Sequence, residues 1–389
     1  MRWAAASSRH QGACDGRQRR SALTNRLHAQ TRFALCDSGM SILEPLARAI
    51  LYLSLALVVG VPIATLSAVL PALRRLSLDT AGVSAALVRW TWGAAALVLI
   101  GGLALFIAQF IPLELALEGF AEWLEFLRLT LLGQMLIVRV GLGALALLTL
   151  WLASKGRVSL RTAMIACPLI GAAAHATLAG TSHSAAMDAG LMPVLADLAH
   201  LFAGALWCGG LVGVLVTCTH LRRTVGEMNM HAAAREMTKR FSPLASLGIM
   251  LASGTGLVLS SIHLPEAGSL STSSYGQLIL LKVGLVVAVL LIGARLRQAI
   301  YHRSNAIDRL LFAEAVIACG IFVSAALLTS TAPPHEMIVH QMADGTVHAM
   351  AKVDLDFQRL LFTLALAVFA AGAFMVALEW ARSLKGSLR

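Results

Sequence analysis

The stretch "YGQLILLKVGLVVAVLLIGARLR", residues 275–297, contains a long apolar run with one charge inside it, Lys282, and two arginines at its end. About 20 apolar residues are enough to cross the hydrocarbon core of a bilayer. Because lipid cannot hydrogen-bond an exposed backbone, such a segment is expected to be helical. The run has none of the apolar and polar alternation that marks the strands of a membrane barrel. The stretch therefore predicts a transmembrane helix.

Stretches of this kind recur along almost the whole chain. Of the 389 residues, 58% are hydrophobic and 13% are charged, and the mean hydropathy is +0.77. A soluble protein of this composition would expose far too much apolar surface to water. We therefore predict an all-α fold, a polytopic transmembrane helical bundle with about nine spans. The predicted spans are 46–70, 89–111, 128–153, 160–180, 191–218, 241–263, 276–298, 308–331 and 358–381.

The connections between the predicted spans alternate in charge. Basic residues gather in the connections 74–89, 155–161, 220–240 and 295–309 and in the C-terminal tail. The alternate connections 112–127, 181–191 and 264–275 have no Lys or Arg, and 332–357 has only Lys352. Basic residues near span ends stay in the cytoplasm. The basic connections and the C-terminus are therefore predicted to lie on the cytoplasmic side of the cytoplasmic (inner) membrane. The other connections are predicted to lie on its outer side.

The first 39 residues do not fit this orientation. They contain seven arginines and no apolar run that could form the core of a signal peptide. Such a basic segment should resist transfer to the outside. We expect residues 1–39 to be a misassigned start or a non-structural basic extension, with Met40 opening the first span, and a disordered tail is the alternative. The remaining basic excess is explained by topology, so no nucleic-acid partner is expected.

An internal repeat organises the spans. "GQMLIVRVGL" at 133–142 and "GQLILLKVGL" at 276–285 match at five of ten positions, and "IAC" recurs at 165–167 and 317–319. Spans one to four thus resemble spans five to eight, and an even number of helices per copy makes the repeat parallel. Chance similarity among apolar helices is the alternative. The predicted units are a first repeat at 40–190, a second at 191–331, an outward loop at 332–357, and the ninth span with its tail at 358–389.

The outward loop contains "HEMIVHQMADGTVHAM", residues 335–350, with three copies of His-x-Met. Thioether sulfur suits Cu(I), and imidazole accepts both Cu(I) and Cu(II). Zinc or nickel would favour His with carboxylate or thiolate, which are sparse here. In a polar connector, packing is a poor explanation for methionine. The predicted copper ligands of the loop are His335, Met337, His340, Met342, His348 and Met350.

Further candidate ligands lie at the outer ends of the spans. His175 is near the outer end of the fourth span, and His183 and Met187 follow in the connection. Asp197 and His200 are three residues apart on one face of the fifth span. Ionisable residues inside a span are expensive and usually face a partner or a cavity. We predict His175, His183, Met187 and His200 as metal ligands and Asp197 as the residue that orients His200, the alternative being a purely structural pair.

Other features of the spans are expected to be structural. Lys282 is near the outer end of its span and is expected to extend toward the interface. "GGLVG" at 209–213 predicts the close approach of another helix. The cysteines inside the spans form no Cys-x-x-Cys pair and are expected to be small core residues. They are Cys167, Cys208, Cys218 and Cys319.

The chain also resembles a known family. The segments "DLAHLFAGALWCGGL", "RFSPLASLGIMLASGTGLVLS", "YGQLILLKVGLVVAVLLIGARLR" and "FAEAVIACGIFVSAALLTSTAP" resemble, in their order and spacing, the copper-resistance D (CopD) family of bacterial inner-membrane proteins. The resemblance is strongest over 240–331 and extends more weakly to about residue 45. It implies copper passage across the cytoplasmic membrane, often beside a periplasmic copper-binding partner, CopC. The triple His-x-Met is not part of the family pattern and rests on the residues alone.

The residues and the resemblance together predict a copper permease, acting in import, with the copper ion as its transported ligand and no enzyme activity. Copper would be collected by the outward loop, or accepted from a CopC-like donor, and passed by His183 and Met187 to His175 and His200. No nucleotide-binding Gly-x-x-x-x-Gly-Lys-Ser/Thr motif is present, so no intrinsic ATPase is expected. The alternatives are a b-type haem electron carrier with His175 and His200 as axial ligands, and a copper-binding scaffold or sensor without transport.

Overall fold

A computed structural model describes residues 42–110, 120–186, 190–302, 306–334, 354 and 356–371. The regular structure within these residues is helical, and eight of the helices are long and apolar enough to cross a membrane. The prediction of an all-α, polytopic helical bundle is confirmed. The predicted ninth span corresponds to a helix over 356–371, and the rest of that span lies outside the described residues.

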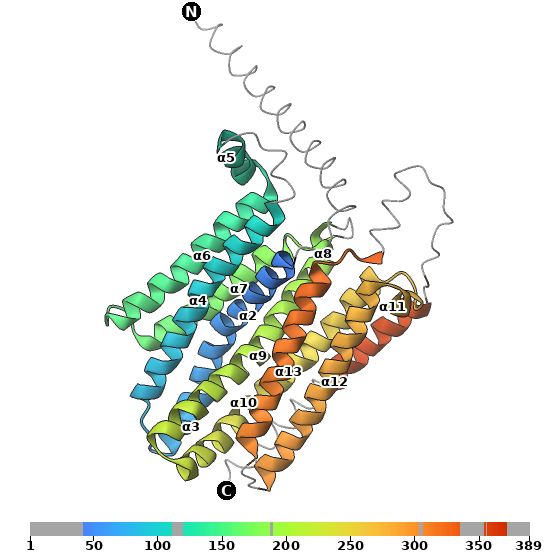
Figure 1. Cartoon of the computed structure of the whole chain (residues 1–389). Coiled ribbons are helices and arrows are strands. Elements are labelled where there is room, and N and C mark those ends of the chain that lie inside the picture. Colours follow the sequence, from blue (N-terminus) through green and yellow to red (C-terminus); the bar gives the residue numbers. More distant parts are fainter. Residues whose placement is uncertain are drawn as a thin grey trace, which may run out of the picture.

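The membrane-length helices fall into two sets of four (Figure 1). The first set is α2 (Leu43–Ala64, continued by the π-helical turn η1, Thr65–Val69, and α3, Leu70–Arg75), α4 (Ala81–Phe110), α6 (Leu131–Ser154) and α7 (Leu160–Ala179). The second set is α9 (Met192–Thr224), α10 (Glu227–His263), α12 (Ser274–Tyr301) and α13 (Ile307–Thr329). The short helices α5 (Phe120–Leu129), α8 (His183–Ala186) and α11 (Ser269–Thr272) lie in the connections.

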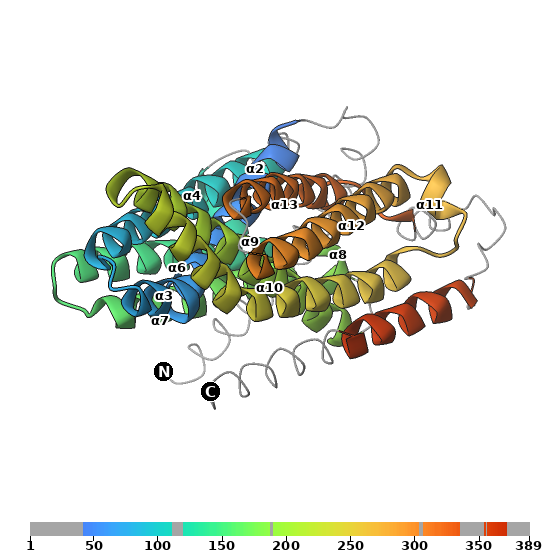
Figure 2. The same cartoon turned by 90° about the horizontal axis from the view of Figure 1, so that it is seen from below.

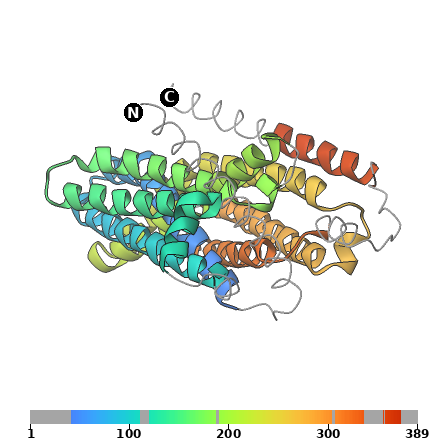
Figure 3. The ribbon, with the colours of Figure 1, turned by 90° about the horizontal axis from the view of Figure 1, so that it is seen from above.

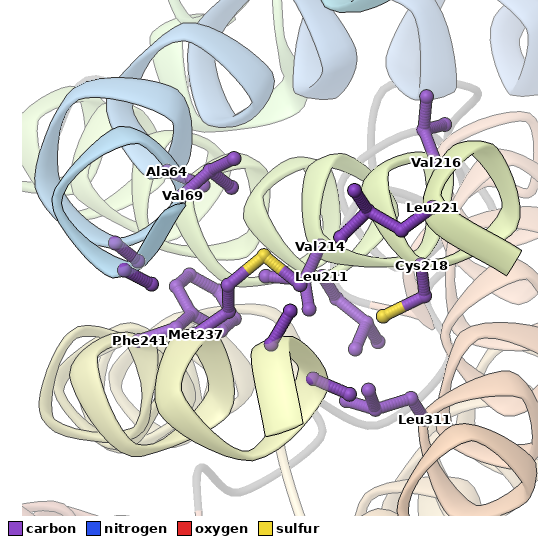
Figure 4. Packing of buried hydrophobic residues seen from close by; sticks show 14 of the residues in the cluster. Ala64, Val69, Leu211, Val214, Val216, Cys218, Leu221, Met237, Phe241 and Leu311 are labelled. Carbon is purple, nitrogen blue, oxygen red and sulfur yellow. The ribbon is translucent and has the colours of Figure 1, made fainter. Parts of the chain in front are cut away.

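The sixth span begins earlier than predicted. The sequence indicated a basic loop up to residue 240, but α10 starts at Glu227. Met230, Met237 and Phe241 are buried in one cluster, and Figure 4 shows the last two facing Leu211 and Val214 of α9. Their spacing of seven and four residues places them on one helix face. The charged residues of this segment lie beside that face, so its composition concealed an amphipathic helix.

The matching Gly-Gln sequences at the starts of α6 and α12 have the same structural role. The Thr130 hydroxyl oxygen accepts the Gly133 N–H at 3.0 Å, and the Ser273 hydroxyl oxygen accepts the Gly276 N–H at 2.9 Å. Both are N-caps, which satisfy a backbone donor that the helix leaves unpaired. The side chains of Gln134 and Gln277 each donate to a carbonyl oxygen six residues earlier. The repeated sequence therefore builds the same helix start twice.

Helices α2 and α9 form the centre of the bundle. In their most apolar windows 72% and 67% of the residues are buried, whereas only 6% are buried in α12. A Cβ atom on Gly209 of α9 would overlap the carbonyl oxygen of Ala56 in α2, so only glycine permits this backbone approach. The close approach predicted from "GGLVG" is confirmed, with α2 as the partner. Exposed apolar side chains on α6 and α12 form the surface that faces lipid.

The packing of the outer helices is reciprocal between the two sets. α7 of the first set packs against α9, and α13 of the second set packs against α2. Figures 2 and 3 show the bundle from below and from above, with α4, α6 and α7 toward one side and α12 toward the other. This order is what a parallel repeat about a central axis requires. The repeat and the unit boundaries stay predictions, and this packing supports them.

The two sets differ in how completely they close. In the first set, α2, α4, α6 and α7 each pack against their neighbours around a ring. In the second set, α12 packs mainly on α13 and makes little contact with α10. The helix over 356–371 approaches α10, because a Cβ atom on Gly254 would collide with the ring of Phe369. Helices α10 and α12 of the second set are thus only loosely packed against each other.

The connections of like charge gather at the same end of the bundle. α5, α8 and α11 lie at one end, and the basic connections lie at the other, beside α3 (Figure 1). We call these the outer end and the inner end after the predicted orientation, which stays a prediction. At the inner end Glu236 pairs with Arg75 at 3.0 Å and Arg240 at 2.9 Å, and Arg222 pairs with Asp308. The Arg75–Glu236 pair joins α3 of the first set to α10 of the second, and the Arg222–Asp308 pair joins α9 to α13 within the second set.

Candidate metal centre

His200 lies inside the second set, with its ring held by α10. Its Nδ1 atom is 2.8 Å from the carbonyl oxygen of Ala252 and 3.2 Å from the hydroxyl oxygen of Thr255. A carbonyl oxygen can only accept a hydrogen bond, so Nδ1 carries the proton and Nε2 presents a lone pair. A histidine that binds a metal typically has this arrangement, with its other nitrogen donating to a backbone carbonyl or carboxylate.

Gly256 of α10 makes room for this ring. A Cβ atom at that position would lie 3.2 Å from Cε1 of His200, which is closer than most real contacts of this kind. The residue is helical, so its lack of a side chain, rather than an unusual backbone angle, is what the site uses. The position of His200 is therefore fixed by the backbone of α10 on two sides.

Lys282 of α12 reaches the remaining nitrogen of His200. Its Nζ atom lies 3.2 Å from Nε2, so the ammonium group donates to the lone pair that a metal ion would use. The expectation that Lys282 extends toward the interface is wrong. The side chain instead extends from α12 to α9, where it contacts His200. The face of α12 that carries Lys282 is therefore directed into the bundle. Sequence reasoning missed this residue, although any charge inside a span is a functional candidate.

Asp197 has partners other than the predicted one. Its carboxyl group is hydrogen-bonded to the Ser182 hydroxyl and lies within electrostatic range of Lys282, His183 and His263. The prediction that Asp197 orients His200 is not what the contacts show, because the Ala252 carbonyl and the Thr255 hydroxyl hold Nδ1. Asp197 instead places a negative charge close to the lysine that contacts His200. Its electrostatic role is toward the cations of the centre.

Two more histidines lie at the outer end beside Asp197. His183 belongs to α8, which packs against α9. His263 ends α10, with its Nδ1 atom 2.7 Å from the carbonyl oxygen of Leu259 and its ring 6.2 Å from that of Tyr275. Both lie within electrostatic range of Asp197, as Lys282 does. His263 did not figure among the predicted ligands.

His175 lies apart from this group, in the first set. It is buried on α7, and its Nδ1 atom is 2.9 Å from the carbonyl oxygen of Gly171 in the same helix. Its helix also carries Thr177, to which Arg139 of α6 donates two hydrogen bonds, at 2.9 and 3.2 Å. The structure thus places His175 and His200 in different halves of the bundle.

The remaining predicted ligands lie outside the described residues. These are Met187 and the loop residues His335, Met337, His340, Met342, His348 and Met350. Within the described part of the chain, no group of three or more His, Cys, Asp or Glu side chains is close enough to hold a metal ion. The described centre therefore offers His200 as a single prepared nitrogen ligand, with His183, His263 and Asp197 nearby.

A bundle of eight membrane-length helices with a histidine, a lysine and a carboxyl group in its interior defines a polytopic membrane protein with an intramembrane polar centre. Comparison with known families is more specific. Residues 40–194 match the family model described as copper resistance protein D-like, N-terminal domain, and residues 235–328 match that of copper resistance protein D. The chain belongs to the copper resistance protein D family.

One curated relative gives a similar indication. The copper transport protein CutJ of Bacillus subtilis (strain 168) is 31% identical over 159 residues. That alignment covers 40% of this chain and 28% of CutJ, so the chain spans well under half the length of this relative. No solved structure matches the chain. The resemblance predicted from the sequence is confirmed, and it identifies a multi-pass membrane protein of a copper-related family.

Proposed function

We propose that this protein carries copper ions inward across the cytoplasmic membrane through the second set of helices. The observation that carries the proposal is the state of His200, whose Nδ1 atom is fixed by a backbone carbonyl while Nε2 presents its lone pair to a cation. Membership of a copper resistance family supports copper as that cation. Imidazole nitrogen is a suitable ligand for both Cu(I) and Cu(II).

The ammonium group of Lys282 acts as a tethered stand-in for the ion. It occupies the Nε2 lone pair at 3.2 Å when copper is absent. A lone pair binds one partner at a time, so an arriving copper ion displaces the ammonium group. The carboxyl group of Asp197 lies within electrostatic range and receives the displaced charge. The exchange keeps a cation at His200 throughout, which avoids an unpaired polar group inside the membrane.

The loosely packed side of the second set, between α10 and α12, is the proposed access route. α10 and α12 make little contact, and Lys282 joins α12 to α9 across that side. Copper would be collected by the His/Met loop at 335–350, or accepted from a CopC-like donor, and pass His183 on the way inward. These loop ligands, with Met187 and His175, stay predictions. His175 belongs to the first set and is placed less well for this route than His263.

Of the alternatives, the haem protein is the less well supported. Haem with two histidine ligands needs them on facing helices at matching depth. His200 has its ring nitrogens directed at α10 and α12, whereas His175 is on α7. An absorption spectrum of the purified protein without a Soret band would exclude this alternative. A copper-binding scaffold or sensor differs only in lacking net movement of the ion, so transport must be measured directly.

The test is copper uptake into proteoliposomes that contain the full chain, measured with a copper indicator inside the vesicles. Wild type is expected to accumulate copper, and His200→Ala to lose uptake by about a hundredfold even at saturating copper, because the ion loses its prepared ligand in a low-dielectric site. Cys167→Ala, a change of a buried residue in the first set, is the matched control and should transport normally. Normal uptake by His200→Ala would contradict the assignment, and no uptake by wild type would favour a scaffold or sensor.

A further inference from the structure

The inner half of the second set contains a buried carboxyl group for which the mechanism above has no use. Glu314 of α13 is 5% exposed, and its Oε1 atom accepts a hydrogen bond from Nε1 of Trp207 at 2.9 Å. Trp207 of α9 is itself 4% exposed. Glu314 lies seven residues into α13, about 10 Å along the helix from its inner end. A carboxyl group at this depth is expensive and marks an ion or proton pathway more often than simple packing.

Glu314 lies inward of His200 on the same route. His200 and Trp207 are seven residues apart on α9, which is almost two full turns, so both side chains leave the same face of that helix. Trp207 is about 10 Å closer to the inner end than His200. Its hydrogen bond to Glu314 places that carboxyl group next to the same face of α9. The outer ligand and the inner carboxyl group are thus successive positions along one face of α9.

A soft ligand stands beside this carboxyl group. Cys208 follows Trp207 directly, and both are buried in one cluster with Ala318, which lies one turn from Glu314 on α13. Cys208 also lies within electrostatic range of Glu314 and Cys319. Thiolate sulfur is the protein ligand best suited to Cu(I). Cys319 of α13 is exposed at the surface of the bundle, so the expectation that it is a core residue is wrong. Cys208 is the sulfur that the bundle encloses.

We infer that Cys208 and Glu314 form an inner station for Cu(I), which receives the ion from His200 and releases it toward the cytoplasm. This inference rests on the proposed function for its direction, and it supplies a sulfur ligand, Cys208, and a proton acceptor, Glu314, for the inner half of the route. Trp207 is a positioning residue here, because it holds the carboxyl group through one of its two oxygens.

The transfer balances in charge and protons. When Cu(I) bonds to the Cys208 sulfur, the thiol proton leaves, and the Glu314 carboxylate accepts it. The station therefore changes from a thiol with a carboxylate to a copper thiolate with a carboxylic acid, and the only net charge gained is that of the ion. When copper departs inward, the proton returns to sulfur. No oxidant or reductant takes part, because copper stays Cu(I).

The variant Glu314→Gln tests the station directly, since its amide oxygen can still accept the Trp207 hydrogen bond while the proton acceptor is lost. Cys208→Ala tests the sulfur separately, and Cys167→Ala, a buried cysteine of the first set, is the matched control. Each variant of the full chain is purified, checked for a monodisperse elution profile, and titrated with Cu(I) against a competing chelator. The same preparations are then reconstituted for uptake.

We expect Glu314→Gln and Cys208→Ala each to bind one fewer Cu(I) than wild type and to lose uptake by about tenfold or more, whereas Cys167→Ala matches wild type in both. Full copper binding with normal uptake in Glu314→Gln and Cys208→Ala would overturn the station. If wild type binds copper but transports none, the proposed function fails, while the loss of one bound ion in both variants still supports the station. The binding measurement therefore separates the two failures.

Discussion

The two halves of the bundle have the same frame but different polar interiors. When α2–α3 and α9 are aligned at their shared Leu-Arg-Arg ends, Tyr52 occupies the position of His200. The repeated segments of α6 and α12 likewise align Arg139 with Lys282. Arg139 lies within electrostatic range of Tyr52 but donates its hydrogen bonds to Thr177, whereas Lys282 contacts His200.

This difference separates a structural cation from an exchangeable one. A guanidinium group with two hydrogen bonds to one residue is held in place, and a tyrosine offers no nitrogen ligand to replace it. An ammonium group at a single lone pair can be displaced by a metal ion. The two halves also differ at the position of Glu314. The shared "IAC" segments align Glu314 with Thr162, which has no carboxyl group. Under the proposed function, the second half would carry the chemistry and the first half would support it.

The largest effect is expected where the two halves meet. Gly209→Leu should destabilise the protein by about 3 kcal/mol, since its side chain would overlap the backbone of α2 near Ala56. Gly284→Leu on α12, where a Cβ atom meets nothing within 4 Å, should be tolerated. Thermal unfolding in detergent, followed by fluorescence size-exclusion chromatography, measures both. Equal stability of the two variants would show that the halves do not depend on this contact.

Exchanging the two cations tests the comparison itself. Lys282→Arg should reduce copper uptake by about tenfold or more, because a guanidinium group forms several directional hydrogen bonds and is harder to displace from His200. Arg139→Lys should leave uptake close to wild type, although it removes a hydrogen bond to Thr177. Initial uptake rates at saturating copper, with matched protein content, give the result. If Arg139→Lys reduced uptake and Lys282→Arg did not, the roles of the two halves would be reversed.

A smaller effect is expected from the glycines beside the two polar groups. Gly256→Ala would bring a Cβ atom to 3.2 Å from Cε1 of His200 and shift the ring, so copper affinity should fall by about threefold to tenfold. Gly102→Ala would place its Cβ atom 3.9 Å from Arg139, an ordinary contact, and should have no effect. Isothermal titration with Cu(I) and a competing chelator compares them. An unchanged affinity in Gly256→Ala would mean that His200 is not held as tightly as its contacts indicate.

The smallest effect is expected outside the bundle. Replacing Met337, Met342 and Met350 together by Leu should reduce uptake about threefold at low copper and not at all at saturation, because redundant soft ligands raise the local supply of the ion without forming its path. A concentration series of uptake rates separates the two conditions. A loss that persists at saturating copper would place these methionines on the path itself and weaken the contrast between loop and bundle.

The sequence predicted the frame better than the interior. Apolar length and the alternation of basic connections were enough for the eight helices, because both are set by the bilayer and need no packing information. The direction of Lys282 could not be predicted, since α12 is apolar on every side and its pattern does not indicate which side faces the bundle. The amphipathic start of α10 was concealed by its charges in the same way. Glu314 was visible in the sequence as an acid well inside a span, and its hydrogen bond with Trp207 shows where it lies in the bundle.

The glycine contact between α2 and α9 also determines how the bundle can move. At this contact the backbones of α2 and α9 touch without intervening side chains. Because no side chain can repack there, we expect the distance between the two helices to stay fixed. Movement is easier at the opposite side of the second half, where α12 has little contact with α10 and is tied to α9 by Lys282. Displacing that lysine would free α12 to swing about the fixed centre. Binding of the ion at His200 would then break the contact that holds α12 against α9.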